Sequence, residues 1–291
     1  MPRLFCFGLG YSAAALADAL RDEDWQIAGT CRSAARAEML AARNIDAHRF
    51  DRDHPLADAP AALAGATHVL VSVPPDDAGD PVLDLHETDL AASETVEWVG
   101  YLSSTSVYGD RRGEWVDETS ELAPRGDRAI ARAAAEDAWL DVWHRYGLPV
   151  HLFRLAGIYG PGCSVIDQLR AGTAKRVEKL GHLFSRIHVD DIVQVLRASM
   201  ARPNAGAIYN VCDDEPAPAA DVVEHASRLL GVAPPPVVPW EKAGLSPAAL
   251  EFYGASRRVR NDRIKRELGV TLRHPDYRRG LAACLTGDRP S

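Results

Sequence analysis

Short apolar runs alternate with longer helical patterns in the first half of the chain, and this alternation limits the fold more than any other feature. The apolar runs are RLFCFG (3–8), QIAGTC (26–31), DAHRF (46–50), HVLVSV (68–73), EWVGYLSS (97–104) and PVHLFRL (149–155). Helical patterns at 11–21, 33–43, 56–64, 84–95 and 126–146 separate or follow them. Strands that alternate with helices join through right-handed crossovers and form a parallel sheet. We therefore expect an α/β fold with a doubly wound parallel sheet.

After residue 160 strand and helix patterns no longer alternate regularly. The pattern there predicts a helix near 163–171, a hairpin at 174–188, a helix from 191, a strand at 207–212 and a helix from 219. We expect one domain at 1–160 and a mixed segment at 161–291. The second segment is expected to hold a smaller C-terminal substrate lobe and to return a strand and a helix to the sheet. Open α/β sheets bind ligands at the carboxyl edge of their strands, where such a lobe would fold.

The charge balance argues against a nucleic-acid partner. The 291 residues include 33 Lys and Arg against 41 Asp and Glu, for a formal net charge of -8. A polyanion is therefore repelled over most of the surface. The basic stretch RRVRNDRIKRE (257–267) has Val259, Ile264 and the following Leu268 at apolar positions, which predicts an amphipathic helix with a solvated basic face.

Cysteine usage indicates a cytoplasmic protein. The five cysteines are odd in number and have no CxxC spacing, which favours reduced thiols over a disulfide framework or a zinc site. The ten histidines are scattered and form no HExxH pair, so we predict no metal. No apolar run reaches the ~18 residues of a membrane span, and we expect no membrane partner.

A glycine pattern follows the first expected strand. FGLGYSAAALA places Gly8, Gly10 and Ala13 in a Gly-x-Gly-x-x-Ala spacing, with Tyr11 and Ser12 at the start of the helix. The first glycine permits a tight turn, the second lets the backbone approach a pyrophosphate, and the alanine keeps the helix close to the sheet. This spacing after a strand predicts a dinucleotide site, which makes the sheet one of the Rossmann type.

The second strand favours NADP as the cofactor. An NAD site normally has Asp or Glu where this chain has Cys31 and Arg32. The guanidinium of Arg32 is a permanently charged fork that suits a 2′-phosphate, and Ser33 adds a hydroxyl while capping the next helix. The alternative is that Arg32 is a surface residue and the cofactor is NAD.

Further coenzyme contacts are expected at the ends of the third and fourth strands. Asp51 could accept a hydrogen bond from the adenine amino group, or it could be a turn-forming Asp in FDRDHP. Ser72, Val73 and Pro74 would run along the ribose and pyrophosphate.

Four segments resemble the extended short-chain dehydrogenase/reductases, the superfamily of NAD-dependent epimerases and dehydratases. They are YLSSTSVYGD (101–110), FRLAGIYGPG (153–162), SRIHVDDIV (185–193) and IYNVCDDEP (208–216). They occur in the family's order, and the resemblance covers nearly the whole chain. It implies that Ser104 hydrogen-bonds the substrate oxygen and that Thr105 lies beside it in the catalytic motif. It also makes Ser103 and Ile158 candidate coenzyme contacts.

The chain departs from this family at the proton-transfer pair. The resemblance places a Tyr-x-x-x-Lys pair at about 128 and 132, where this sequence has Arg128 and Arg132. Arginine does not give up its proton near neutral pH, so Arg128 cannot replace the tyrosine as an acid or base. Arg132 could bind ribose hydroxyls or phosphate, or it could form a surface ion pair with Glu136. The departure resembles the atypical branch of the superfamily.

Other side chains could still take part in the chemistry. Tyr108 and Tyr159 follow strands and could donate a proton, or both could anchor loops by packing. Arg186 could meet an anionic substrate or be an exposed arginine. His188 is more typical of a buried structural histidine than of a catalytic one, and Asp190 is expected to cap the following helix.

Three functions remain open. The first is an NADP-dependent oxidoreductase that acts on a small carbonyl-type substrate with a non-standard active site. The second is a catalytically impaired NADP-binding regulator or redox sensor, and the third is a nucleotide-sugar epimerase or dehydratase. Gly157 stands where the family's sugar-nucleotide enzymes carry Asn, which makes the third function less favoured. The resemblance also allows a homodimer through helices 84–95 and 126–146.

Overall fold

The computed structural model describes residues 1–286. They divide into two compact units, each formed by three separate segments of the chain. Unit 1 comprises Met1–Ser104, Asp127–Arg154 and Val193–Tyr209. Unit 2 comprises Thr105–Gly126, Leu155–Ile192 and the chain from Asn210 onward. Each unit is therefore built from segments that are distant in the sequence.

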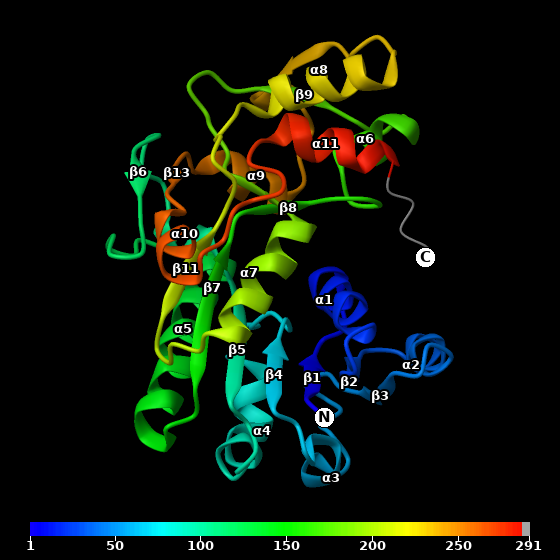
Figure 1. The fold of residues 1–291 in the computed structure, drawn as a ribbon. Coiled ribbons are helices and arrows are strands. Elements are labelled where there is room, and N and C mark those ends of the chain that lie inside the picture. Colours follow the sequence, from blue (N-terminus) through cyan, green and yellow to red (C-terminus); the bar gives the residue numbers. More distant parts are fainter. Residues whose placement is uncertain (287–291) are drawn as a thin grey trace. The chain divides into compact units, whose positions relative to one another are not determined.

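Unit 1 is built on a seven-stranded sheet with the strand order β11-β7-β5-β4-β1-β2-β3 (Figure 1). The strands are β1 (Arg3–Phe7), β2 (Gln26–Cys31), β3 (Asp46–Arg49), β4 (His68–Val71), β5 (Trp98–Ser104), β7 (Val150–Leu155) and β11 (Ile208–Val211). The pairs β1–β2, β1–β4, β2–β3 and β4–β5 are parallel. The α/β, Rossmann-type prediction is confirmed. The chain reverses its direction of winding between β1 and β4, and ligands of open α/β sheets bind at such a point.

The helices that connect these strands begin where the sequence offers a cap. They are α1 (Tyr11–Arg21), α2 (Ala34–Ala41), α3 (Ala59–Leu63), α4 (Pro81–Ala91), α5 (Asp127–Tyr146) and α7 (Val189–Ala201), the last of which starts in unit 2. Ser33, Asp58 and Asp80 accept backbone N–H bonds at the starts of α2, α3 and α4. Such a cap is typically worth ~1 kcal/mol. Buried Phe7, Tyr101 and Trp139 belong to the core that these elements share.

Unit 2 consists of short elements and three two-stranded sheets. Its elements are the 3-10 helices η1 (Thr105–Tyr108) and η2 (Trp240–Lys242), the strands β6 (Trp115–Val116), β8 (Gly157–Tyr159), β9 (Arg176–Glu178), β10 (Arg186–His188), β12 (Val237–Pro239) and β13 (Arg258–Val259), and the helices α6 (Val165–Arg170), α8 (Ala219–Leu230), α9 (Pro247–Gly254), α10 (Asp262–Leu268) and α11 (Tyr277–Thr286). Buried side chains of α6, α8 and α11 form one core cluster with Tyr159, among them Ile166, Val222 and Leu281.

The hairpin predicted at 174–188 is wrong. β9 pairs in parallel with β12, and β10 pairs in parallel with β8. Both strands of the expected hairpin therefore hydrogen-bond to segments far away in the sequence. Local pattern alone did not reveal this, because two short strands with a polar connection look the same whether they pair with each other or with distant partners.

The basic helix predicted around 257–267 is shorter than expected. Its buried residues Ile264 and Leu268 lie on α10, as the pattern indicated. Val259 instead lies in β13, where it pairs with Val116 of β6. Its backbone N–H donates to the Ser185 hydroxyl. These tertiary contacts hold the residues before Asn261 in an extended conformation.

Among the described residues, no helix combines the length and the apolar character that a bilayer span requires.

Candidate functional site

The turn between β1 and α1 is fixed by hydrogen bonds to neighbouring strands. The Gly8 N–H donates to the Thr30 hydroxyl at 2.8 Å, and the Ser72 hydroxyl donates to the Gly8 carbonyl at 2.5 Å. Gly8 has φ +89°, and a Cβ there would lie 2.9 Å from the Ser72 hydroxyl oxygen. A side chain is therefore excluded both by the backbone conformation and by space. Thr30 belongs to β2, and sequence reasoning missed its role because its only signal is a hydroxyl next to Cys31.

Gly10 is the N-cap of α1, and no side chain caps this helix. A Cβ at Gly10 would have no heavy atom within 4 Å, apart from its own chain neighbours. Open space therefore lies at the start of an 11-residue helix whose first amides need acceptors. Ser12 and Ala13 behind it are buried, while Tyr11 is half-buried. Such a helix start suits a phosphate group, because the helix dipole and the amides both favour an anion.

The end of β2 presents one exposed cation. Cys31 is buried, whereas Arg32 and Ser33 are exposed. The Ser33 hydroxyl accepts the N–H of Arg36, so the predicted cap is confirmed. The guanidinium of Arg32 projects from the carboxyl end of a strand that neighbours β1.

Asp51 takes part in a local turn. One of its carboxylate oxygens accepts the Asp53 N–H at 3.0 Å and lies 2.6 Å from His54 Nδ1. The hydrogen bond with His54 is the largest of the causes that lower the pKa of Asp51. These contacts match the turn-forming alternative. Of the other predicted coenzyme contacts, Ser72 and Val73 are half-buried at the end of β4, and Pro74 is exposed.

Arg132 is held by β5. Its Nη1 donates to the Leu102 carbonyl at 2.9 Å and to the Tyr101 hydroxyl at 3.1 Å. The alternative for Arg132, an ion pair with Glu136, is wrong, because Glu136 is bonded to Arg154 instead. The distance between Arg154 Nη2 and Glu136 Oε2 is 2.7 Å. A buried carboxylate needs a buried cation, and Arg154 supplies it from β7.

Ser103 belongs to the same buried network. It is 4% exposed, and its hydroxyl donates to the Glu136 carboxylate. This places the first serine of the motif against α5. Ser104, the next residue, is half-buried at the end of β5.

The position at which the resemblance places a tyrosine lies open to solvent. Arg128 is exposed in the first turn of α5, one turn before Arg132. A tyrosine does contact Arg132, but it is Tyr101 from β5, which is fully buried. Burial raises the pKa of Tyr101, although the charge of Arg132 opposes this. The phenol therefore keeps its proton and orients the guanidinium. Sequence reasoning missed Tyr101 because it reads as an ordinary core residue of a strand.

The predicted residues of unit 2 are mostly buried. Tyr108 is fully buried, and its hydroxyl donates to Asn210 at 2.8 Å. Tyr159 is 7% exposed, and its hydroxyl oxygen lies so close to α11 that a Cβ at Gly280 would be 1.9 Å away. Burial raises the pKa of Tyr159. The burial of both tyrosines matches the alternative in which they anchor loops by packing.

The other unit 2 candidates differ in accessibility. Arg186 is half-buried and donates to the carbonyls of Phe184 and Ala217, both at 3.0 Å. Thr105 is buried at the start of η1, and Ile158 is exposed on β8. His188 is fully buried, as a structural histidine would be. Asp190 lies in the first turn of α7 rather than before it, so the predicted helix cap is wrong.

A cavity of about 160 Å³ lies within unit 2, and no sequence motif pointed to it. Lys179, His182 and Tyr253 are among its lining residues, together with the start of α8. A cavity of roughly 150 Å³ holds one benzene-sized molecule. The lining combines aromatic and charged groups, as small-molecule sites commonly do.

The comparisons with known proteins show the family of the chain. The sequence model of the NAD dependent epimerase/dehydratase family matches residues 8–212. The chain therefore belongs to the NAD dependent epimerase/dehydratase family. The match begins at the glycine turn and ends just after β11, so it includes every strand of the seven-stranded sheet except β1.

Three relatives illustrate the similarity. The protein YeeZ of Escherichia coli K12 is 28% identical over 288 residues, which cover 95% of this chain and 97% of YeeZ. A 3-diazoavenalumate denitrifying reductase of a Streptomyces species is 35% identical over 143 residues, 45% of each chain. A solved structure of a conserved protein of unknown function from Silicibacter pomeroyi is 48% identical, with a TM-score of 0.90 over 98% of this chain and 99% of that one.

Proposed function

We propose that the protein is an NADP-dependent oxidoreductase that acts on a small carbonyl-type substrate with a non-standard active site. The observation that carries the proposal is the open start of α1 at Gly10, which no side chain caps, in a chain where an exposed arginine directly follows β2. The first feature suits a pyrophosphate, and the second suits a 2′-phosphate.

Different residues of unit 1 would bind different parts of the coenzyme and the substrate. The first amides of α1 would hold the pyrophosphate, and Arg32 would pair with the 2′-phosphate. The bound coenzyme would supply or accept a hydride. Ser104 would donate a hydrogen bond to the substrate oxygen, as the family resemblance implies. Arg132, already oriented by Tyr101 and Leu102, would contact ribose hydroxyls or a phosphate.

The proton of the reaction needs another source than the family tyrosine. Arg128 cannot supply it, and Tyr101, Tyr108 and Tyr159 are buried. We therefore assign this proton to solvent. The relative named as a reductase lends support to the oxidoreductase class, since it shares 35% identity over 143 residues.

Turnover by a serine variant tests this proposal. The purified full-length protein is assayed for NADPH oxidation against a panel of small aldehydes, ketones and imines. We expect Ser104→Ala to lower kcat by roughly 10²- to 10³-fold, because one donor to the developing oxyanion is lost. Ser93→Ala, after the end of α4, is the matched control and should leave turnover unchanged. Equal turnover by Ser104→Ala and the unmodified protein would contradict the assigned role.

The burial of the phenols favours a second candidate function, an NADP-binding regulator or redox sensor. With no accessible phenol among Tyr101, Tyr108 and Tyr159, the site has the means to bind a coenzyme but lacks the family's proton donor. Tight NADPH binding without oxidation of any member of the panel would support this candidate over the enzyme.

A further inference from the structure

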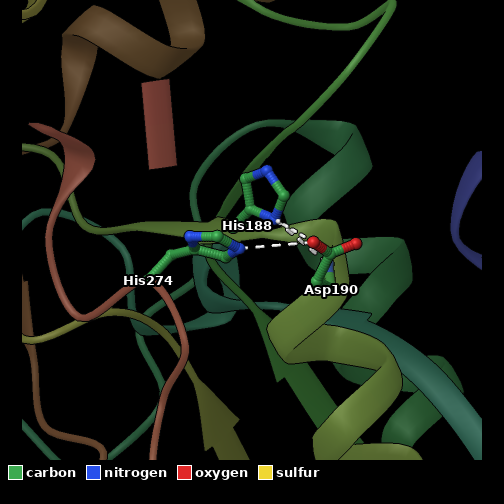
Figure 2. A group of neighbouring side chains, drawn as sticks. All are labelled: His188, Asp190 and His274. Atoms are coloured by element: carbon green, nitrogen blue, oxygen red, sulfur yellow. Dashed lines mark hydrogen bonds and ion pairs between the residues drawn. The ribbon is translucent and has the colours of Figure 1, made fainter. Parts of the chain in front are cut away.

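Two imidazoles and one carboxylate converge in unit 2, next to Tyr159, whose ring packs edge-on against that of His188. They belong to His188 at the end of β10, Asp190 in the first turn of α7, and His274 in the segment between α10 and α11 (Figure 2). His188 Nδ1 lies 3.4 Å from Asp190 Oδ2, and His274 Nε2 lies 3.2 Å from the same oxygen. All three potential ligand atoms lie within 4.8 Å of one another.

These separations fit the edges of a metal site, and the 3.2 Å contact between His274 Nε2 and Asp190 Oδ2 is a hydrogen bond in the absence of an ion. In a tetrahedral zinc site with bonds of about 2.1 Å, two ligand atoms are about 3.4 Å apart. The two measured edges at Asp190 have this length. The third edge, between the two histidine nitrogens, needs at most a modest rotation of His274, whose side chain is 13% exposed.

The hydrogen bonds of His188 define its tautomer. Its Nδ1 accepts the backbone N–H of Asp190 at 3.2 Å, so this nitrogen carries the lone pair. Its Nε2 lies 3.8 Å from the Cys284 sulfur and carries the proton in this tautomer. Zinc at this nitrogen would replace the Asp190 N–H as the partner of the lone pair, and it would bridge Nδ1 and the carboxylate oxygen, which lie 3.4 Å apart.

The neighbouring residues hold the three groups in place. Both carboxylate oxygens of buried Asp191 accept backbone N–H bonds, from Arg273 at 2.7 Å and from His274 at 3.0 Å. This fixes the backbone that carries His274 against the start of α7. The positive end of the α7 dipole repels a cation at this position. The negative charges of Asp190 and Asp191 offset this repulsion.

We propose that His188, Asp190 and His274 bind one divalent transition-metal ion of the zinc class. Two imidazoles select zinc or a neighbouring metal over Mg²⁺ or Ca²⁺, which take oxygen ligands. Asp190 is 32% exposed, so solvent can supply the fourth ligand. Sequence reasoning missed the site because its third ligand lies 84 residues beyond the second. The inference does not depend on the coenzyme proposal.

Calorimetric titration of the full chain with ZnCl₂ tests the inference. Cys163→Ser serves as the background, since thiols bind zinc and this one is exposed. We expect one equivalent of zinc to bind with a Kd below about 10 µM. MgCl₂ under the same conditions should give no binding. Zinc should also raise the Tm of the protein, a readout that needs no activity.

Single ligand variants distinguish this site from adventitious binding. His274→Ala and Asp190→Asn should each weaken zinc binding at least tenfold and abolish the rise in Tm. His225→Ala, a half-exposed histidine of α8 outside the cluster, is the control and should bind zinc as the background does. Absence of zinc binding, or equal affinities for the His274→Ala and His225→Ala proteins, would overturn the inference.

Discussion

At the scale of single residues, Arg128 and Arg132 lie one turn apart on α5, and they differ in their surroundings. Arg132 is tied to Leu102 and Tyr101, whereas Arg128 is exposed. A cation that is already oriented loses less entropy when it binds a ligand, so Arg132 is the better candidate for a coenzyme contact. We propose that a third arginine, Arg32, sets the coenzyme preference.

Replacement of Arg32 should separate the two coenzymes. We expect Arg32→Ala to weaken NADPH binding roughly 10- to 150-fold, because one charged hydrogen bond is worth about 1.5–3 kcal/mol. NADH lacks the 2′-phosphate, and its affinity should change little. Arg43→Ala removes a surface arginine that pairs with Asp18 and serves as the control. Calorimetry with both coenzymes measures the effect, and equal losses for NADPH and NADH would show that Arg32 does not contact the 2′-phosphate.

At the scale of elements, the long helix α5 is joined to the sheet by a buried ion pair. Glu136 of α5 and Arg154 of β7 have side chains that are 2% and 4% exposed, and Ser103 of β5 donates to the same carboxylate. The pair thus connects one helix with two strands. Because neither charge can reach water, each depends on the other.

Breaking this pair should cost much of the protein's stability. We expect Glu136→Gln to lower the free energy of unfolding by about 3–5 kcal/mol, since it leaves the Arg154 charge buried without an anion. The double variant Glu136→Gln/Arg154→Met should recover part of the loss. Glu87→Gln, which breaks the surface pair with Arg145, should cost at most about 1 kcal/mol. Urea unfolding measures all three, and an unchanged midpoint for Glu136→Gln would refute this role.

The elements of the sheet were predictable from sequence, and those of unit 2 were less so. Strands such as β1 are continuous apolar runs because both faces are buried, and the helix starts carry caps such as Ser33. The glycine turn was visible because Gly8 and Gly10 have a fixed spacing from β1. The two-residue strand β13 and the pairing of β9 with β12 left no such pattern, because tertiary contacts decide them.

Within the candidate site, the sequence indicated which residues could be functional but not which side chains they would bond to. The motif indicated Ser104 and the position of Arg132, and the chemistry of arginine excluded proton transfer at Arg128. The Tyr101 hydroxyl could not be assigned to Arg132, since it comes from the preceding strand. In the same way, the pair of Glu136 with Arg154 depends on how α5 packs on β7.

At the scale of the whole molecule, buried titratable groups make stability depend on pH in two opposing ways. Burial lowers the pKa of His151 to about 4. Its Nε2 accepts the Asn204 N–H, so the folded protein holds it neutral. The unfolded chain binds this proton first as the pH falls below about 6.5, so stability is lost from there down to about pH 4. Buried Asp80 and Asp213 have raised pKa values, again through burial, and they oppose this loss.

A variant that does not titrate isolates the histidine contribution. Between pH 7 and pH 5 we expect His151 to cost the native protein about 2 kcal/mol. His151→Gln can keep both hydrogen bonds, to Val99 and Asn204, without titrating in this range. Urea unfolding at several pH values should therefore show a flatter acid limb for His151→Gln than for the unmodified protein. Parallel limbs would contradict the assignment.

The central claim is that the start of α1 holds the pyrophosphate of a coenzyme, and calorimetry with Gly10→Ala tests it most directly. The added Cβ meets nothing in the protein, so the Tm should stay unchanged, while it would occupy the space that the pyrophosphate needs. Gly254→Ala, whose Cβ also meets nothing, is the control. We predict that the unmodified and Gly254→Ala proteins bind NADPH and that Gly10→Ala loses at least tenfold in affinity. Undiminished NADPH binding by Gly10→Ala, or no heat from the unmodified protein with either NADPH or NADH, would contradict the account.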